Sequence, residues 1–185
     1  NGSGKSTLVK LLTGLYVPQG GRILLNEVLI DATNRNYYRE HFSVVFADYY
    51  LFKRLFGLEA SRRGDEIAAY LTRLGMDRKV TVERDQFSTI ALSSGQRRRL
   101  ALLTAYMEDR PVYVFDEWAA DQDPTYKEVF YMRLLPELKA RGKCVVVVTH
   151  DDRYFPCGDR ILRLEGGCLT EVGERSIRER LAAGR

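Results

Sequence analysis

NGSGKSTLVKLL, residues 1–12, is the stretch that decides which fold the chain is expected to have. Residues 4–6 match the end of the phosphate-binding pattern G-x-x-x-x-G-K-[ST], whose first glycine would lie two positions upstream of Asn1. Apolar residues at helical spacing follow in residues 5–15, so a helix is expected to begin at the loop. A glycine-rich turn that opens into a helix points backbone N–H groups and the positive end of the helix dipole at an anion. The stretch therefore predicts a site for a nucleotide phosphate.

Residues 1–7 each have an expected part in that site. Amides of the glycine-rich turn cradle phosphate oxygens, the ammonium group of Lys5 reaches the β- and γ-phosphates, and the hydroxyl of Ser6 ligates Mg²⁺. A flexible loop that contains the same letters by chance is the alternative interpretation. The nucleotide contacts expected here are Asn1, Gly2, Ser3, Gly4, Lys5, Ser6 and Thr7.

Composition places the chain among ordinary globular domains. Its 185 residues are 45% hydrophobic and 29% charged, a balance that allows a sizeable core. A formal net charge of +4, with basic residues interspersed among 25 acidic ones, predicts no long basic surface for nucleic acid. The longest apolar runs, such as residues 145–148, are far shorter than the roughly 20 residues of a membrane-spanning helix. Neither nucleic-acid binding nor membrane insertion is expected of these residues.

Two smaller features of the sequence have plain expected explanations. The three cysteines, at positions 144, 157 and 168, match no zinc or C-x-x-C spacing and are expected to be reduced thiols, with Cys144 in the core. Arg97, Arg98 and Arg99 form a compact basic run. A solvated helix face is expected for this run, and a patch that binds an anion or a partner is the alternative.

Strand and helix patterns alternate along the rest of the chain. Residues 22–30 are expected to form a hairpin around Asn26, and a helical insert without strong strand runs is expected at about residues 53–92. Pro136 is expected to kink or split the helix that contains it. Strands are expected at residues 43–47, 112–115 and 144–149 and near positions 161 and 169, and helices at 94–107, 125–141 and in the Arg-rich C-terminal tail. This alternation predicts an α/β domain with a largely parallel sheet.

The segment PVYVFDE, residues 111–117, combines a buried strand with two acids at its C-terminal edge. In a parallel sheet that edge lies beside the phosphate loop, so Asp116 is expected to hold the coordination sphere of Mg²⁺, usually through water. Glu117 points elsewhere and is expected to orient an attacking water or to accept its proton. A simple cap at the end of the strand is the alternative interpretation.

Residues 92–96, LSSGQ, precede the helix that is expected to start near Gln96. Small residues before a helix N-terminus, with serine hydroxyls as additional donors, form a second surface that can accept an anion. Taken alone, the segment indicates only a capped helix start. It closely resembles, however, the signature motif of ABC-type ATPases, and the order of the motifs along the chain is similar to that family as well.

This resemblance covers essentially the whole chain and implies a specific architecture. It implies a P-loop NTPase of ABC type, in which a mostly parallel core sheet is joined by an antiparallel β subdomain and by a helical subdomain at about residues 53–92. Residues 1–185 would then be one ATPase domain that begins inside the Walker A loop. The implied cofactors are ATP and Mg²⁺, with Ser6 and Asp116 on the metal.

The same resemblance assigns roles to individual residues. Glu117, His150 and Lys5 are implied to be catalytic, with His150 in contact with the γ-phosphate and the attacking water. Each ATP would be sandwiched between the phosphate loop of one copy and the signature of a second copy, bound head to tail. The residues implied to bind nucleotide outside the phosphate loop are Ser93, Ser94, Gly95, Gln96 and Asp123.

One position departs from the family pattern. Ala47 stands where the family usually carries glutamine, and alanine can neither ligate Mg²⁺ nor position water. That role is either lost or passed to the neighbouring Asp48, whose carboxylate is a hard oxygen ligand. The other family role of this loop, coupling to membrane helices, is not excluded by the change.

A finer resemblance connects three segments, FADYYLF, LSSGQRRRLA and FDEWAADQDP, to the ATPase domain of bacterial cyclic-peptide and siderophore exporters. Trp118 and residues 121–124 carry this finer assignment. The subgroup implies a membrane domain upstream in the same chain, a place at the cytoplasmic face of the bacterial inner membrane, and ATP-driven export of a peptide or siderophore-like substrate. A soluble ABC-type ATPase that acts on nucleic acid or ribosomes is the alternative. A nucleotide sensor without hydrolysis is disfavoured by the presence of Asp116, Glu117 and His150.

Overall fold

A central parallel sheet organises the part of the chain that the computed structural model describes, residues 3–173. Its strands lie in the order β3 (Phe42–Val45), β6 (Val112–Asp116) and β7 (Cys144–Val148). All three are parallel, and Asp116 lies opposite Val148. Because parallel strands end at the same edge of a sheet, the residues that follow β6 and β7 come together there.

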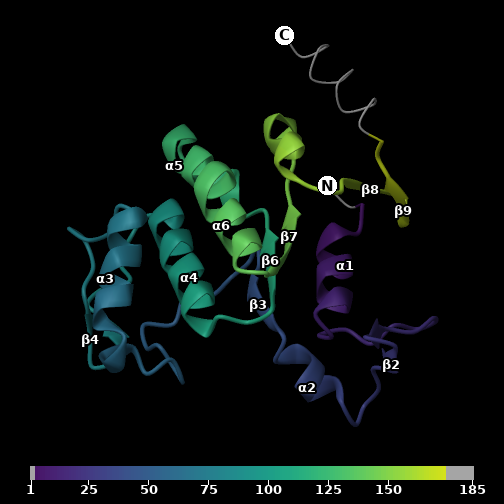
Figure 1. The fold of residues 1–185 in the computed structure, drawn as a ribbon, viewed down its shortest axis with the longest axis horizontal. Helices are drawn as coiled ribbons and strands as arrows, with labels where there is room; N and C mark the ends of the chain where they lie inside the picture. The colour runs from purple at the N-terminus through teal and green to yellow at the C-terminus, as the bar shows by residue number, and fades with distance from the viewer. Residues whose placement is uncertain (1–2, 174–185) are drawn as a thin grey trace.

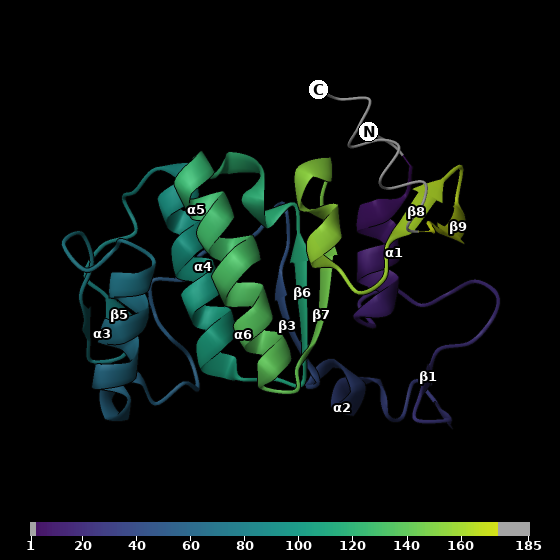
Figure 2. The same cartoon turned by 45° about the horizontal axis from the view of Figure 1, so that its top comes forward.

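Helices cover both faces of the sheet (Figures 1 and 2). Helix α1 (Lys5–Leu12) lies on one side, whereas α4 (Ser94–Glu108) and α6 (Leu135–Ala140) lie on the other. Parallel strands need crossover connections. Here α3 (Gly64–Arg73) and α4 connect β3 to β6, and α5 (Pro124–Val129) and α6 connect β6 to β7. The structure thus confirms the α/β class with a parallel sheet that the sequence predicts.

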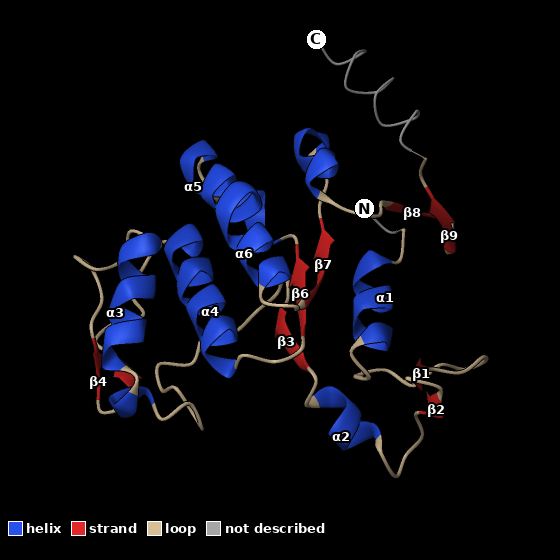
Figure 3. Ribbon diagram, in the orientation of Figure 1, coloured by secondary structure: helices blue, strands red, loops and turns tan. Residues whose placement is uncertain are grey.

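Short antiparallel hairpins accompany the main sheet (Figure 3). The hairpins in residues 3–173 are β1 (Leu24–Leu25) with β2 (Val28–Leu29), β4 (Val82–Glu83) with β5 (Gln86–Phe87), and β8 (Leu162–Glu165) with β9 (Cys168–Glu171). The first was predicted from the alternation around Asn26. Asn26 and Glu27 have φ angles of 48° and 68°, and positive φ at both central residues is what a type I′ hairpin turn requires. Helix α2 (Arg35–Arg39) follows this hairpin.

Aromatic packing fixes the middle strand β6 against the helices. The rings of Trp118 and Phe130 are stacked with centroids 4.3 Å apart, and Phe130 meets Phe115 edge to face at 5.2 Å. Tyr70 of α3 stacks on Tyr106 of α4 at 4.9 Å. Such pairs contribute beyond the apolar area they bury. The end of β6, which carries the predicted acids, is therefore held in a dense core.

The segment around Pro136 stays helical from Pro124 to Ala140, so the proline disturbs the form of the expected helix but does not split it. After α5 the chain forms a π-helical turn, η3 (Phe130–Leu134), and α6 then begins directly before Pro136. Proline donates no backbone hydrogen bond and its ring clashes with the carbonyl group four residues earlier, here that of Met132. The wider π turn accommodates that clash.

Three details of the expected fold are corrected by the structure. In the part of the chain that the structure describes, Cys144 is exposed rather than part of the core, because it begins β7, which pairs there with β6 alone, and the valines after it are only half buried. The insert at about residues 53–92 contains the β4–β5 hairpin as well as α3 and a 3₁₀ turn, η1 (Ala60–Arg62). The first helix ends at Leu12, and the Arg-rich tail lies outside the described residues. Within residues 3–173, no helix has both the length and the apolar character needed to cross a membrane.

Candidate functional site

The phosphate loop leads into α1 through a glycine. Gly4 has φ 90° and ψ 8°, a left-handed conformation that suits a residue without Cβ, and Lys5 then opens the helix. The Lys5 ammonium group donates a hydrogen bond to the Ser3 hydroxyl at 3.0 Å, so its charge stays at the loop. Asn1 and Gly2 lie outside the described residues. The described part of the loop has the helix N-terminus and the cation that a phosphate group needs.

Ser6 and Asp116 meet where α1 approaches the end of β6. The Asp116 residue is buried, which raises the pKa of its carboxyl group, and repulsion from Glu117 raises that pKa further. Hydrogen bonds that the Ser6 hydroxyl and the Ala47 N–H donate to the carboxylate lower the pKa of Asp116. A hydroxyl beside a carboxylate is a pair of hard oxygen donors, and a cation there would favour the charged carboxylate. The residues present therefore fit the predicted Mg²⁺ site.

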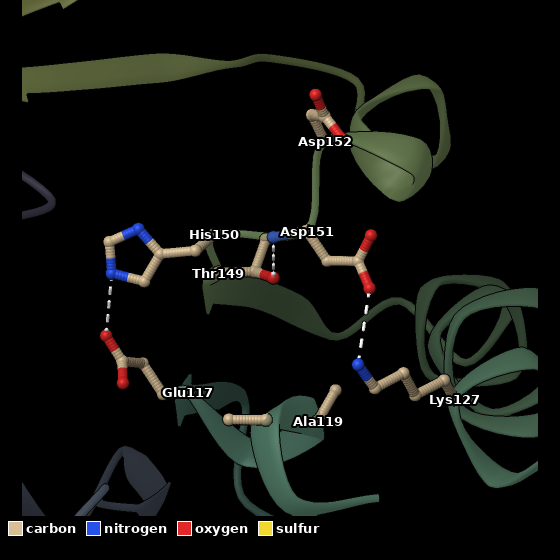
Figure 4. A pocket seen from close by; sticks show the side chains of 8 residues that line it. Glu117, Ala119, Lys127, Thr149, His150, Asp151 and Asp152 are labelled. Atoms are coloured by element: carbon tan, nitrogen blue, oxygen red, sulfur yellow. Dashed lines mark hydrogen bonds and ion pairs between the residues drawn. The ribbon is translucent and has the colours of Figure 1, made fainter. Parts of the chain in front are cut away.

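Glu117 and His150 face each other across the ends of β6 and β7 (Figure 4). The Glu117 N–H donates to the carbonyl oxygen of Val148 at 3.0 Å, which continues the pairing of the two strands. The Glu117 backbone then turns to φ 52° and ψ 30°, a left-handed conformation that costs a residue with a side chain roughly 1–2 kcal/mol. In this geometry the Glu117 Oε1 lies 3.0 Å from the His150 Nε2. Both side chains remain partly exposed, so water and a nucleotide can reach them.

Polar contacts hold the loop that carries His150. The Thr149 hydroxyl accepts hydrogen bonds from the Asp151 N–H at 3.1 Å and from the Tyr131 hydroxyl at 2.9 Å. The Asp151 carboxylate pairs with the Lys127 ammonium group at 3.4 Å. The loop and the end of β6 enclose a pocket of about 310 Å³ (Figure 4), which is lined by Glu117, Ala119, Ala120, Lys127, Thr149, His150, Asp151 and Asp152.

The LSSGQ segment forms the capped start of α4. The Ser93 hydroxyl accepts a hydrogen bond from the Gln96 N–H, and the Gln96 side chain accepts one from the Ser93 N–H, both at 3.3 Å. Ser93 and Ser94 are exposed. A Cβ atom at position 95 would lie 2.8 Å from the Asp121 carbonyl oxygen, so this close approach requires Gly95. Because α1 and α4 lie on opposite sides of the sheet, one copy does not bring this segment to the phosphate loop (Figure 2).

A family model described as ABC transporter matches residues 1–120, more than half of the chain. The chain belongs to the ABC transporter family. The ATP-binding protein SyrD of Pseudomonas syringae pv. syringae is 51% identical over 173 residues, which make up 92% of this chain but 31% of SyrD. The chain thus spans less than two thirds of that relative's length.

Solved structures agree with this assignment. The cbiO1 protein of Clostridium perfringens, described as part of the ABC transporter complex cbiONQ, matches with a TM-score of 0.74 and 27% identity, over 100% of this chain and 77% of that one. The cassette MJ0796, described as a dimer in a post-hydrolysis state bound to ADP and Pi, matches with a TM-score of 0.71 and 26% identity, over 93% and 82% of the two chains. The ABC-type fold and the ATP-hydrolase class predicted from the motifs are therefore confirmed.

In this ABC ATPase domain the basic run of α4 is not the solvated helix face that the sequence led us to expect. Arg97 is exposed, but Arg98 and Arg99 are each only 8% exposed. Helical spacing places these two arginines on the same side as Leu102 and Leu103, which are fully buried. That shared spacing is the sequence signal that would have revealed their burial.

Arg99 connects α4 to Asp123, one of the predicted nucleotide contacts. Its guanidinium group donates to the Gln122 side-chain oxygen and to the Asp123 carboxylate, both at 2.9 Å, and lies over the Tyr126 ring at 3.2 Å. The Asp123 carboxylate also caps α5 by accepting from the Tyr126 N–H. Asp123 thus has a structural role within one copy, and its contact with nucleotide stays a prediction.

Ala47 lies at the site through its main chain. Its N–H donates to Asp116, and its carbonyl oxygen accepts from Arg98 at 3.2 Å. The neighbouring Asp48 carboxylate is exposed and lies 4.0 Å from the Lys10 ammonium group, and its charge raises the pKa of Asp116. Asp48 is therefore close enough to act on Asp116 electrostatically, and its part as a replacement for the family glutamine stays a prediction.

Proposed function

We propose that the chain is the ATPase domain of a bacterial exporter, in which a head-to-tail dimer hydrolyses Mg·ATP and drives a peptide or siderophore-like substrate across the inner membrane. The observation that carries this proposal is the 3.0 Å contact between Glu117 and His150, at the sheet edge where Ser6 meets Asp116. Residues 1–185 would form one such domain, with a helical subdomain at about residues 53–92.

Each residue at the sheet edge has its own role in ATP hydrolysis. Lys5 and the N-terminus of α1 hold the β- and γ-phosphates. Ser6 and Asp116 would hold Mg²⁺, which neutralises phosphate charge when bound. Glu117 orients the attacking water toward the γ-phosphate and accepts its proton. His150 contacts the γ-phosphate, and its Nε2 keeps the Glu117 carboxylate in position.

A second copy completes each site in this proposal. Within one copy the signature segment and the phosphate loop lie on opposite sides of the sheet (Figure 1). The exposed Ser93 and Ser94 hydroxyls, with Gly95, Gln96 and Asp123, would approach the ATP that the other copy holds. The description of MJ0796 as a dimer bound to ADP and Pi supports this arrangement.

An exposed aromatic surface supports a membrane partner. Tyr50, Phe52 and Phe56 are 74%, 59% and 64% exposed, and their rings meet edge to face. Large apolar side chains gathered on a surface mark an interaction site. These residues lie shortly after Ala47, next to the loop whose family role is coupling to membrane helices. We propose that a membrane domain docks there and that the chain works at the cytoplasmic face of the inner membrane.

Glu117→Gln in the full-length protein tests the proposal. ATP binding is expected to persist while hydrolysis falls by about 100-fold or more, since the proton acceptor is lost. Transport measured in membrane vesicles is expected to stop as well. Glu128→Gln is the matched control, because Glu128 is an exposed acid on α5. Normal turnover in Glu117→Gln would remove Glu117 from this role, and hydrolysis stimulated by nucleic acid without any transport would favour the soluble alternative.

A further inference from the structure

Arg98 connects three parts of the site from inside the protein. One guanidinium nitrogen, Nη1, donates to the carbonyl oxygens of Glu117 and Trp118. The other, Nη2, donates to the carbonyl oxygen of Ala47 at 3.2 Å and pairs with the Asp121 carboxylate, also at 3.2 Å. The Arg98 side chain is only 10% exposed. A planar group with several fixed donors can make these bonds together, which a lysine cannot.

The Trp118 side chain in turn contacts the main chain of Arg98. Its indole N–H donates to the carbonyl oxygen of Arg98 at 2.9 Å, and its ring stacks on Phe130 with centroids 4.3 Å apart. Each of the two side chains therefore holds the main chain of the other. We call this pair of reciprocal contacts the Arg98–Trp118 clasp.

The clasp lies at the turn that aims the Glu117 carboxylate. Glu117 directly precedes the 3₁₀ turn η2 (Trp118–Asp121), and its carbonyl oxygen also accepts from the Ala120 N–H of that turn at 3.1 Å. The left-handed backbone of Glu117 persists only where surrounding contacts over-determine it. Arg98 supplies such contacts at two consecutive peptide groups, the one that joins Glu117 to Trp118 and the one that follows Trp118.

We propose that Arg98 is a positioning residue for ATP hydrolysis: through the Glu117 and Trp118 carbonyl oxygens it fixes the left-handed turn that keeps the Glu117 carboxylate beside His150. This inference rests on the proposed role of Glu117 in hydrolysis. Through Arg98, the start of α4, which carries the signature segment, is hydrogen-bonded to the turn that positions Glu117. Arg98 itself is not placed in contact with nucleotide.

The test uses Arg98→Gln in the full-length protein, with Arg97→Gln as the matched control. Arg97 is the adjacent arginine and is exposed. We expect Arg98→Gln to lower kcat by roughly 10- to 100-fold, as small misplacements of catalytic groups do, while the Kd for ATP stays close to that of the unchanged protein. Arg98→Lys keeps the charge but has fewer hydrogen-bond donors. Its kcat is therefore expected to lie between that of Arg98→Gln and that of the unchanged protein. Trp118→Phe removes the indole N–H and keeps one aromatic ring at this position, and we expect it to lower kcat as well.

Several outcomes overturn the inference. A folded Arg98→Gln variant with unchanged kcat would do so, as would a loss of ATP affinity that accounts for the whole effect. If Arg98→Gln does not fold, Arg98→Lys and Trp118→Phe replace it. The same result is expected of them, a lower kcat with an unchanged Kd for ATP. Glu117→Gln, measured in parallel, distinguishes a failure of the role proposed for Glu117 from a failure of the role proposed for Arg98. Normal turnover in Glu117→Gln removes the proposed role of Glu117, whereas an inactive Glu117→Gln beside a fully active Arg98→Gln removes only the role of Arg98.

Discussion

Glu117 and His150 lie in contact, with 3.0 Å between the Oε1 and Nε2 atoms, because they follow two adjacent parallel strands. Asp116 pairs with Val148 in the register of β6 and β7, and the next residues of each strand leave the sheet at the same edge. The contact is therefore a product of sheet topology rather than of proximity along the chain.

Replacing His150 by alanine should slow hydrolysis without abolishing ATP binding. Loss of a group that positions the proton acceptor is expected to lower kcat by about 100-fold, because such groups act in the transition state. His41→Ala is the control, since the His41 ring lies 3.0 Å from the Tyr37 carbonyl oxygen and edge to face with the Tyr37 ring, directly before the start of β3. Steady-state ATPase assays of the full-length variants measure the difference, and equal losses in both would contradict the assignment.

Gly95→Ala should loosen the start of α4. A methyl group there meets the Asp121 carbonyl oxygen at 2.8 Å, so the helix or the η2 turn must shift. Overpacking of this kind typically costs about 1–3 kcal/mol in the free energy of unfolding, and ATP-dependent dimerisation should weaken as well. Gly20→Ala, where an added methyl group meets nothing within 4 Å, is the matched control. Urea unfolding and size-exclusion chromatography with ATP are the measurements, and an unchanged Gly95→Ala variant would show that this close packing is not required.

Arg99→Ala should destabilise the protein more than Arg97→Ala. Arg99 is buried and its loss leaves the Gln122 side-chain oxygen and the Leu74 carbonyl oxygen without this donor. Each buried polar group left unpaired costs roughly 1–3 kcal/mol, whereas an exposed substitution is expected to stay within about 0.5 kcal/mol. Thermal or urea unfolding of both variants compares them directly. Similar stability of the two would argue that the buried contacts of Arg99 contribute little.

Asp116→Asn should change stability with pH in a defined direction. Burial is the main cause of the raised pKa of Asp116, and repulsion from Glu117 adds to it. The folded state therefore holds this proton more tightly than the unfolded state, and the charged carboxylate weakens folding once the pH exceeds its folded pKa. Without nucleotide and metal, Asp116→Asn is expected to be more stable than the parent protein at neutral pH. That advantage should fade as the pH falls toward the ordinary aspartate value of 3.8.

The same variant is expected to lose hydrolysis, since an amide is a poorer Mg²⁺ ligand than a carboxylate. Unfolding curves at several pH values, with ATPase assays beside them, measure both effects. If Asp116→Asn were less stable than the parent protein at neutral pH, the predicted direction of the change in the free energy of unfolding would be wrong.

Features that depend on residues a few positions apart were determined by the sequence alone. The helix after Gly4, the hairpin at Asn26, the capped start of α4 and the disturbed helix before Pro136 all formed where the local pattern predicts them. Each of these depends on backbone conformation, capping or the missing N–H of proline, which act within one or two helical turns. The motif chemistry and its order along the chain were sufficient to indicate the ABC transporter family.

Only the tertiary structure decided which side chains are inside and which meet across the sheet. Arg98 and Arg99 are buried because the η2 turn and the Ala47 loop cover their side of α4 and supply oxygen acceptors. Cys144 is exposed because, among residues 3–173, β7 pairs with β6 alone. Burial and pairing of this kind depend on neighbours far away in sequence. A local run of charged or apolar residues does not indicate which neighbours those are. The contact of Glu117 with His150 has the same origin, since it exists only once β6 and β7 lie side by side.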